Sequence, residues 1–120
     1  MRNTSIMEKG LKLDFDKLRW DLLPIECVEE IVKVLTFGAK KYADNNWQLV
    51  ENSTERYYAA LMRHIVEWRK GDPVDRDSEL NHLSHALCNL IFLLWFEKNQ
   101  HQTKIIDDLN YEVDEKVTWM

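Results

Sequence analysis

With 120 residues, the chain has the length of one domain, which can bury only a modest core. Its 16 basic and 21 acidic side chains give a formal net charge of −5, which argues against a binder of polymeric nucleic acid, because such a protein needs a basic face. The longest apolar run, 90–96, is too short to span a bilayer, and residues 1–10 lack the apolar run of a signal peptide. We therefore expect a cytoplasmic protein without a membrane partner.

The composition predicts an all-α fold. Only three glycines and two prolines occur, and the alternation of β-branched residues that is typical of strands is almost absent. We expect a single domain over 1–120, with an N-terminal arm at 1–16 and a weakly packed C-terminal tail at 99–120. Helical spacing predicts helices at about 24–43, 54–70 and 78–98, and a short helix in the tail near 105–109.

The expected helix ends follow from capping chemistry. Pro24 opens the first helix, because proline is favoured in a helix's first turn, and Gly71 ends the second. Side chains that accept hydrogen bonds from backbone amides stand at the two later helix starts: Ser53 or Thr54 for the second helix, and Asp77 or Ser78 for the third.

Apolar stripes on these helices define the expected core. The stripe of the second helix is Tyr57, Leu61, Ile65 and Trp68, and that of the third is Leu80, Leu83, Leu87, Leu90, Ile91 and Leu94. His82, His85 and Asn89 fall in a polar band beside the third-helix stripe. The run 90–96 is apolar all round, as expected for a central or interface helix. Cys27 and Cys88 lie in apolar patterns and are expected to be reduced core thiols.

Acids and imidazoles gather around the loop between the second and third helices. Residues three or four apart project from one helix face, and antiparallel packing would bring both faces to one cavity. The side chains concerned are His64, Glu67, Glu79, His82 and His85, with Asp72, Asp75 and Asp77 at the mouth of the cavity. Carboxylates bind Mg²⁺ or Mn²⁺, and imidazole shifts the preference toward Mn²⁺ and other transition metals. Such ions neutralise a polyphosphate and lower the pKa of an attacking water. The competing interpretation is that the histidines are hydrogen-bonded boundary residues and that the acids at 72–77 solvate the loop and cap a helix.

A second cluster, residues 40–47, lies where the first helix ends. It combines cations, aromatic rings and amides in Lys40, Lys41, Tyr42, Asn46 and Trp47. Rings stack on a base, amides hydrogen-bond to its edge, and lysines pair with phosphate. The alternative is a helix C-terminus with favourable lysines, an Asn-rich turn, and a tryptophan that packs back on the core.

Several short blocks occur in an order that resembles a known family. They are Lys17-Leu18-Arg19-Trp20-Asp21-Leu22-Leu23-Pro24, Phe37-Gly38-Ala39-Lys40-Lys41-Tyr42, Asn46-Trp47, Arg63-His64, Gly71-Asp72-Pro73-Val74-Asp75 and Glu79-x-x-His82-Leu83-x-His85-Ala86. Together they resemble the dATP/dGTP diphosphohydrolase domain found in phages and bacteria, which is related to the MazG-like all-α nucleotide pyrophosphohydrolases. The resemblance covers roughly residues 12–97.

The resemblance implies a MazG-type fold like a four-helix bundle, usually as a homodimer or homotetramer, in the cytoplasm of a bacterium or a phage-infected host. It also implies a metal-dependent enzyme that hydrolyses dATP or dGTP between the α and β phosphates, giving the monophosphate and pyrophosphate. The wider superfamily has Glu-x-x-Glu on one helix and Glu-x-x-Asp on the next. The corresponding spacing here is His64-x-x-Glu67 and Glu79-x-x-His82, so two of the four carboxylates are replaced by histidine.

The sequence thus predicts a site with three kinds of residue. Glu67 and Glu79 are the expected catalytic residues. The expected ligands of Mg²⁺ or Mn²⁺ are Glu67, Glu79, His82, His85 and Asp75, and the expected binders of a purine deoxynucleotide are Lys40, Lys41, Tyr42, Asn46, Trp47, Arg63 and His64. Two alternatives remain open: a nucleotide-binding protein without turnover on the same scaffold, and a helical interaction module whose run 90–96 meets a partner.

Overall fold

A computed structural model of the chain describes residues 10–100. Its α-helices are α1 (Ile25–Lys41), α2 (Ser53–Arg69) and α3 (His82–Lys98), and two short 3-10 turns, η1 (Trp20–Leu22) and η2 (Asn46–Leu49), precede α1 and α2. Over 10–100 there is no strand, only an isolated bridge between Val74 and Asn81. The all-α prediction is confirmed, whereas the short helix expected near 105–109 lies outside the described residues. None of the helices in 10–100 is long and apolar enough to cross a membrane.

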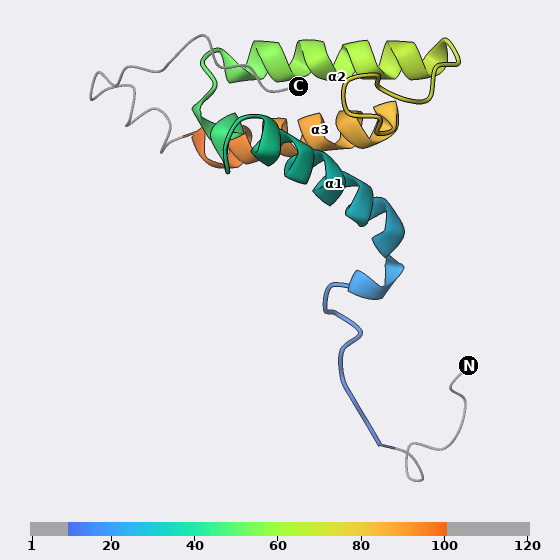
Figure 1. The fold of residues 1–120 in the computed structure, drawn as a ribbon. Helices are drawn as coiled ribbons and strands as arrows, with labels where there is room; N and C mark the ends of the chain where they lie inside the picture. The colour runs from blue at the N-terminus through green and yellow to red at the C-terminus, as the bar shows by residue number, and fades with distance from the viewer. Residues whose placement is uncertain (1–9, 101–120) are drawn as a thin grey trace.

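The three helices form a small bundle around α3. Helices α2 and α3 run antiparallel and pack along much of their length, while α1 crosses α3 at an angle (Figure 1). The turn η2 also contacts α3, so the connection from α1 to α2 closes one end of the core. Residues 10–23 extend away from the bundle (Figure 1). This arrangement brings the end of α2 beside the start of α3, with the loop 70–81 joining them.

The helix starts differ from those expected. Helix α2 follows Asn52, which lies in the left-handed region at φ 55°. Helix α3 begins at His82 rather than near 78, and its cap is Asn81, whose Oδ1 accepts a hydrogen bond from the Leu83 amide at 2.8 Å. The residues expected to cap α3 instead belong to the loop, where Asp77 pairs with Lys41 and Ser78 hydrogen-bonds to Asp75. Gly71, at φ 101°, ends the second helical segment as predicted, because glycine adopts this conformation without a Cβ clash.

The core is built from aromatic rings on α2, α3 and η2. The ring of Trp47 stacks on that of Phe92, with centroids 4.4 Å apart, and the hydroxyl of Tyr57 donates a 2.8 Å hydrogen bond to the carbonyl of Trp47. The buried members of this cluster are Val34, Trp47, Val50, Tyr57, Cys88, Phe92 and Phe96. Because these ring contacts join η2 to α2 and α3, they fix that end of the bundle.

The predicted core stripe of the third helix is wrong. Its members within α3 are all exposed, at 36–51%: Leu83, Leu87, Leu90, Ile91 and Leu94. Helix α3 turns the opposite face inward, where His82, His85 and Asn89 are buried beside Phe92. The prediction failed because it assigned the more apolar face to the core, whereas polar groups that are hydrogen-bonded can be buried at little cost. Of the two expected core thiols, Cys88 is buried and Cys27 is exposed.

Candidate active site

A polar pocket of about 390 Å³ lies where all three helices meet the loop 70–81. Helix α1 contributes residues from its last turn, α2 from its second half, and α3 from its first turn. The lining residues are Phe37, Lys41, Tyr42, Arg63, His64, Glu67, Asp75, Asp77, His82 and His85. Acidic, basic, imidazole and aromatic groups therefore share one cavity.

The loop 70–81 folds around the carboxylate of Asp75. Its Oδ2 accepts hydrogen bonds from the Ser78 amide at 2.9 Å and from the Ser78 hydroxyl at 3.0 Å. The backbone of Asp75 is held as well, since its amide donates to the Leu80 carbonyl at 2.8 Å and its carbonyl accepts from the Glu79 amide at 2.7 Å. These bonds fix the carboxylate in place before any ligand arrives.

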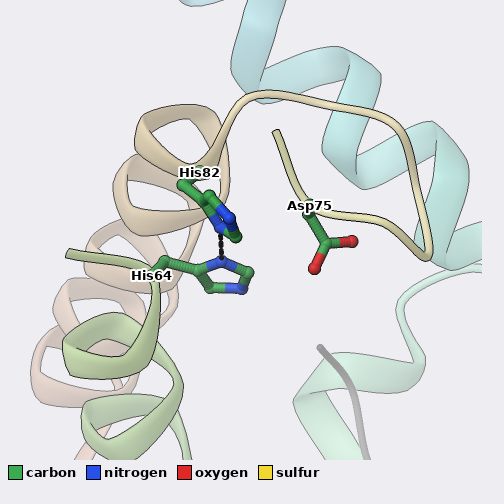
Figure 2. A group of neighbouring side chains, drawn as sticks. All are labelled: His64, Asp75 and His82. Atoms are coloured by element: carbon green, nitrogen blue, oxygen red, sulfur yellow. Dashed lines mark hydrogen bonds between the residues drawn. The ribbon is translucent and has the colours of Figure 1, made fainter. Parts of the chain in front are cut away.

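Two imidazoles, one from α2 and one from α3, meet next to Asp75. His64 on α2 and His82 at the start of α3 approach with Nδ1 facing Nδ1 at 2.9 Å, and the Asp75 carboxylate lies on the loop beside them (Figure 2). One ligand atom from each of His64, Asp75 and His82 can be chosen so that all lie within 4.8 Å of one another. Three convergent donors at such spacing suit a divalent cation.

His85 supports this group from one turn further along α3. Its ring stacks on that of His64, with centroids 4.5 Å apart and planes 9° from parallel. Its Nε2 lies 2.6 Å from the Ser78 hydroxyl, which donates its own hydrogen to Asp75, so the His85 Nε2–H is the donor to Ser78. This chain from His85 through Ser78 orients the Asp75 carboxylate.

Burial keeps the imidazoles neutral. It lowers the pKa of His64 to about 4, with His85 adding to the effect, and it also lowers that of His85. For Asp75 burial alone would raise the pKa, but hydrogen bonds from Ser78 and the nearby imidazoles lower it overall. Near pH 7 His64 and His85 are therefore neutral and Asp75 is ionised, and these are the protonation states that coordinate a cation.

The pocket mouth is lined by the end of α1. The Lys41 ammonium lies 2.6 Å from the Asp77 carboxylate, which raises its pKa, and it stands over the rings of Phe37 and Tyr42 at 5.7 and 5.4 Å from their centroids. Both partners of the ion pair are partly exposed, so a competing anion can displace Asp77 from Lys41 at small cost.

Nine of the residues expected from the sequence line this pocket: Lys41, Tyr42, Arg63, His64, Glu67, Asp75, Asp77, His82 and His85. The others do not line it. Trp47 belongs to the core, as the alternative interpretation had it, and Lys40, Asn46 and Glu79 also lie outside the lining. Of the two expected catalytic carboxylates, Glu67 is in the pocket, half-exposed and 3.6 Å from Lys70, while Glu79 is exposed.

Sequence reasoning missed two contributors, Phe37 and the linking role of Ser78. Phe37 precedes Lys41 by one helical turn, so their shared face was available as a signal. Asp77 was expected at the mouth of the cavity and lines the pocket, but its pairing with Lys41 depends on how α1 crosses the bundle. Ser78 was interpreted as a helix cap, whereas it links His85 to Asp75.

The chain is similar in sequence to proteins of one known family. The model of the family described as "dATP/dGTP diphosphohydrolase, N-terminal" matches residues 7–108, a range that contains every residue of the pocket. The chain belongs to this family. A curated relative from Salmonella phage PMBT28, named dATP/dGTP diphosphohydrolase, is 34% identical over 91 residues. The match covers 76% of the chain but 31% of the relative, so the chain spans about a third of that protein's length. No solved structure matches.

Proposed function

We propose that the chain hydrolyses dATP or dGTP to the monophosphate and pyrophosphate in the pocket between α1, α2 and the loop 70–81. One observation carries the proposal: His64, Asp75 and His82 converge at a pocket whose mouth carries Lys41 and aromatic rings. The activity named for the phage relative supports the choice of reaction and substrate.

His64, Asp75 and His82 would hold a divalent cation, Mg²⁺ or Mn²⁺. The fit is supported by their mutual distances, by the neutral imidazole of His64, and by the carboxylate that Ser78 holds in place. A bound cation would supply charge neutralisation for a polyphosphate and acidify an attacking water. Other groups of the chain have the tasks of binding, orientation and proton transfer.

The basic and aromatic residues would bind the nucleotide. Lys41 and Arg63 both line the pocket, where their charges attract phosphate oxygens. Phe37 and Tyr42 supply ring faces at the mouth, where a purine base can stack. A phosphate that reaches Lys41 would replace Asp77 as its partner, so binding would exchange one ion pair for another.

Glu67 would act as the general base. Its carboxylate lines the pocket and stays half-exposed, so it can accept a proton from water. The water oxygen bonds to the α-phosphorus, the bond from that phosphorus to the bridging oxygen breaks, and pyrophosphate leaves with the electron pair. Arg63 and Lys41 would stabilise the charge that develops on the leaving group.

Pyrophosphate release tests this proposal. The purified chain is incubated with each of the four deoxynucleoside triphosphates and Mg²⁺ or Mn²⁺, and we expect pyrophosphate from dATP or dGTP. Asp75→Asn should lower the rate by about 100-fold, because it removes a charge that the cation needs. Asp44→Asn, the same change at an exposed turn outside the pocket, is the matched control. Absence of pyrophosphate with every nucleotide, from folded protein, contradicts the proposal.

The alternative is nucleotide binding without turnover. It is favoured by the position of Glu79, which leaves Glu67 as the one expected catalytic carboxylate in the pocket lining. Under this alternative dATP raises the melting temperature of the chain by mass action while no pyrophosphate forms. A chain that responds to neither metal nor nucleotide would instead favour the interaction module.

The exposed leucines support self-association as a homodimer or homotetramer. Leu83, Leu87, Leu90, Ile91 and Leu94 form one apolar face of α3, each with more than a third of its surface exposed. An apolar patch of this kind on a soluble domain usually marks a contact surface. The natural occupant of such a face in a homo-oligomer is the same face of a second copy.

A further inference from the structure

The separation within the imidazole pair fits a hydrogen bond and also fits two ligands of one ion. His64 and His82 direct Nδ1 at Nδ1 across 2.9 Å. Two nitrogens bound at right angles to one six-coordinate cation, each about 2.1 Å from it, would be about 3.0 Å apart, whereas at a tetrahedral ion they would be about 3.4 Å apart. The observed separation therefore already matches two adjacent ligands of one ion.

The buried edge of His82 gives a second, independent observation. Its Nε2 is buried, and among residues 10–100 it has no hydrogen-bond partner, although buried polar atoms are normally satisfied. The nearest acid is Asp72, whose Oδ2 lies 3.9 Å away. When Nδ1 coordinates a cation, the proton of a neutral imidazole must sit on Nε2, where a carboxylate is the usual acceptor.

His85 does not share this geometry. Its Nε2 donates to Ser78, so that nitrogen has no lone pair to offer a cation. The donor set is thus two imidazole nitrogens and one carboxylate oxygen, rather than the carboxylate-rich set that Mg²⁺ prefers.

We infer that this site selects a borderline transition-metal ion such as Mn²⁺, Co²⁺ or Zn²⁺ over Mg²⁺, with His64, Asp75 and His82 as ligands and Asp72 as the positioning residue for His82. The inference deepens the proposed hydrolytic function and rests on it for its biological meaning. Nitrogen donors bind these ions more strongly than Mg²⁺, which prefers oxygen and keeps its waters. Asp72 closes on His82 Nε2 once the ion fixes the tautomer.

Metal binding without nucleotide tests the inference. Chelator-treated chain is titrated with Co²⁺, Mn²⁺ and Mg²⁺ by isothermal calorimetry, and Co²⁺ should bind at least about 100-fold more tightly than Mg²⁺. His64→Ala should weaken Co²⁺ binding at least tenfold, and His82→Asn serves as the second ligand variant should the first not fold. Asp44→Asn, which removes the same charge at an exposed turn outside the pocket, should leave Co²⁺ affinity unchanged.

Asp72→Asn separates positioning from folding. It should weaken Co²⁺ binding by about tenfold while the melting temperature of the metal-free chain stays unchanged. Equal affinity for Mg²⁺ and Co²⁺, undiminished Co²⁺ binding by folded His64→Ala, or no cation binding by the folded chain each overturns the inference.

The result is separable from the test of hydrolysis. A chain that binds Co²⁺ through these residues but releases no pyrophosphate contradicts the proposed function and leaves the metal site standing. Pyrophosphate release by His64→Ala with Mg²⁺ alone would leave the proposed hydrolysis standing and contradict the need for the metal site, since hydrolysis would then survive without the imidazole pair.

Discussion

The two faces of α3 are built on opposite principles. The inner face carries His82, His85 and Asn89, which are all buried and each hydrogen-bonded to a neighbouring group. The outer face carries leucines and an isoleucine, exposed over a third to a half of their surface. The difference shows that hydropathy alone does not choose the buried side of a helix, because a site needs polar groups held rigidly out of water.

A pair of truncations two residues apart, on opposite sides of α3, makes the comparison quantitative. Phe92→Ala should lower the free energy of unfolding by about 3–5 kcal/mol, because it removes the buried ring that stacks on Trp47 and leaves a cavity. Leu90→Ala, on the outer face, should cost about 1 kcal/mol or less in the same monomer. Urea unfolding at a concentration where the chain is monomeric provides both values, and equal losses would contradict the assignment of the two faces.

A charge on the outer face tests what that face does. Leu90→Glu should shift the chain from oligomer to monomer in sedimentation, because a buried carboxylate opposes the contact between two leucine faces. Thr54→Glu, an exposed position at the start of α2, controls for added charge. Should both variants keep the size of the wild type, the leucine face is not the contact surface.

The contrast also indicates what the sequence can predict. The three helices and the loop follow from spacing, capping and breaker residues, and most pocket residues were found because acids and imidazoles recur at helical spacing around one loop. The orientation of α3 was not predictable in the same way. The sequence showed an apolar stripe and a polar band, but which one faces α2 depends on the tertiary partners of His82 and His85.

Particular misplacements have local causes. Asp77 and Ser78 carry good capping groups, yet Ser78 hydrogen-bonds to Asp75 and Asp77 forms an ion pair with Lys41. Helix α3 therefore starts only after Asn81. Trp47 was expected to stack on a base, but its ring stacks on that of Phe92 in the core. In each case a long-range contact decided between two roles that the residue type allows equally.

The inner face should also make the stability of the metal-free chain depend on pH. Unfolded His64 takes up a proton near its ordinary pKa of 6.5, whereas in the folded chain its pKa is about 4, and that of His85 is lowered too. Protonation therefore favours the unfolded state, so the free energy of unfolding should fall as the pH is lowered from about 6.5 toward 5.

The slope assigns this effect to particular rings. One proton taken up only on unfolding corresponds to about 1.4 kcal/mol per pH unit, and His64→Asn should reduce the slope by up to that amount. Urea titrations at pH 6.5, 5.75 and 5 measure it. The lowered pKa of Asp75 adds a loss of the same sign only at more acid pH, so this window reports on the imidazoles. An unchanged slope in His64→Asn would contradict the burial of that ring.

The smallest expected effect concerns Glu79, which the spacing made a catalytic residue and which the structure places outside the pocket lining. Its backbone lies in the left-handed region at φ 63°, where a residue with a Cβ is strained, and its amide donates to the Asp75 carbonyl. Glu79→Gly should therefore leave the chain as stable or more stable by about 1 kcal/mol or less, because relief of strain is partly offset by the freedom of glycine in the unfolded state. Glu79→Ala, which keeps the strained Cβ, is the matched control and should be the less stable of the two. Both should release pyrophosphate at nearly the wild-type rate, whereas a 100-fold loss in both folded variants would make the Glu79 carboxylate a catalytic group and would mean that the loop rearranges when the nucleotide binds.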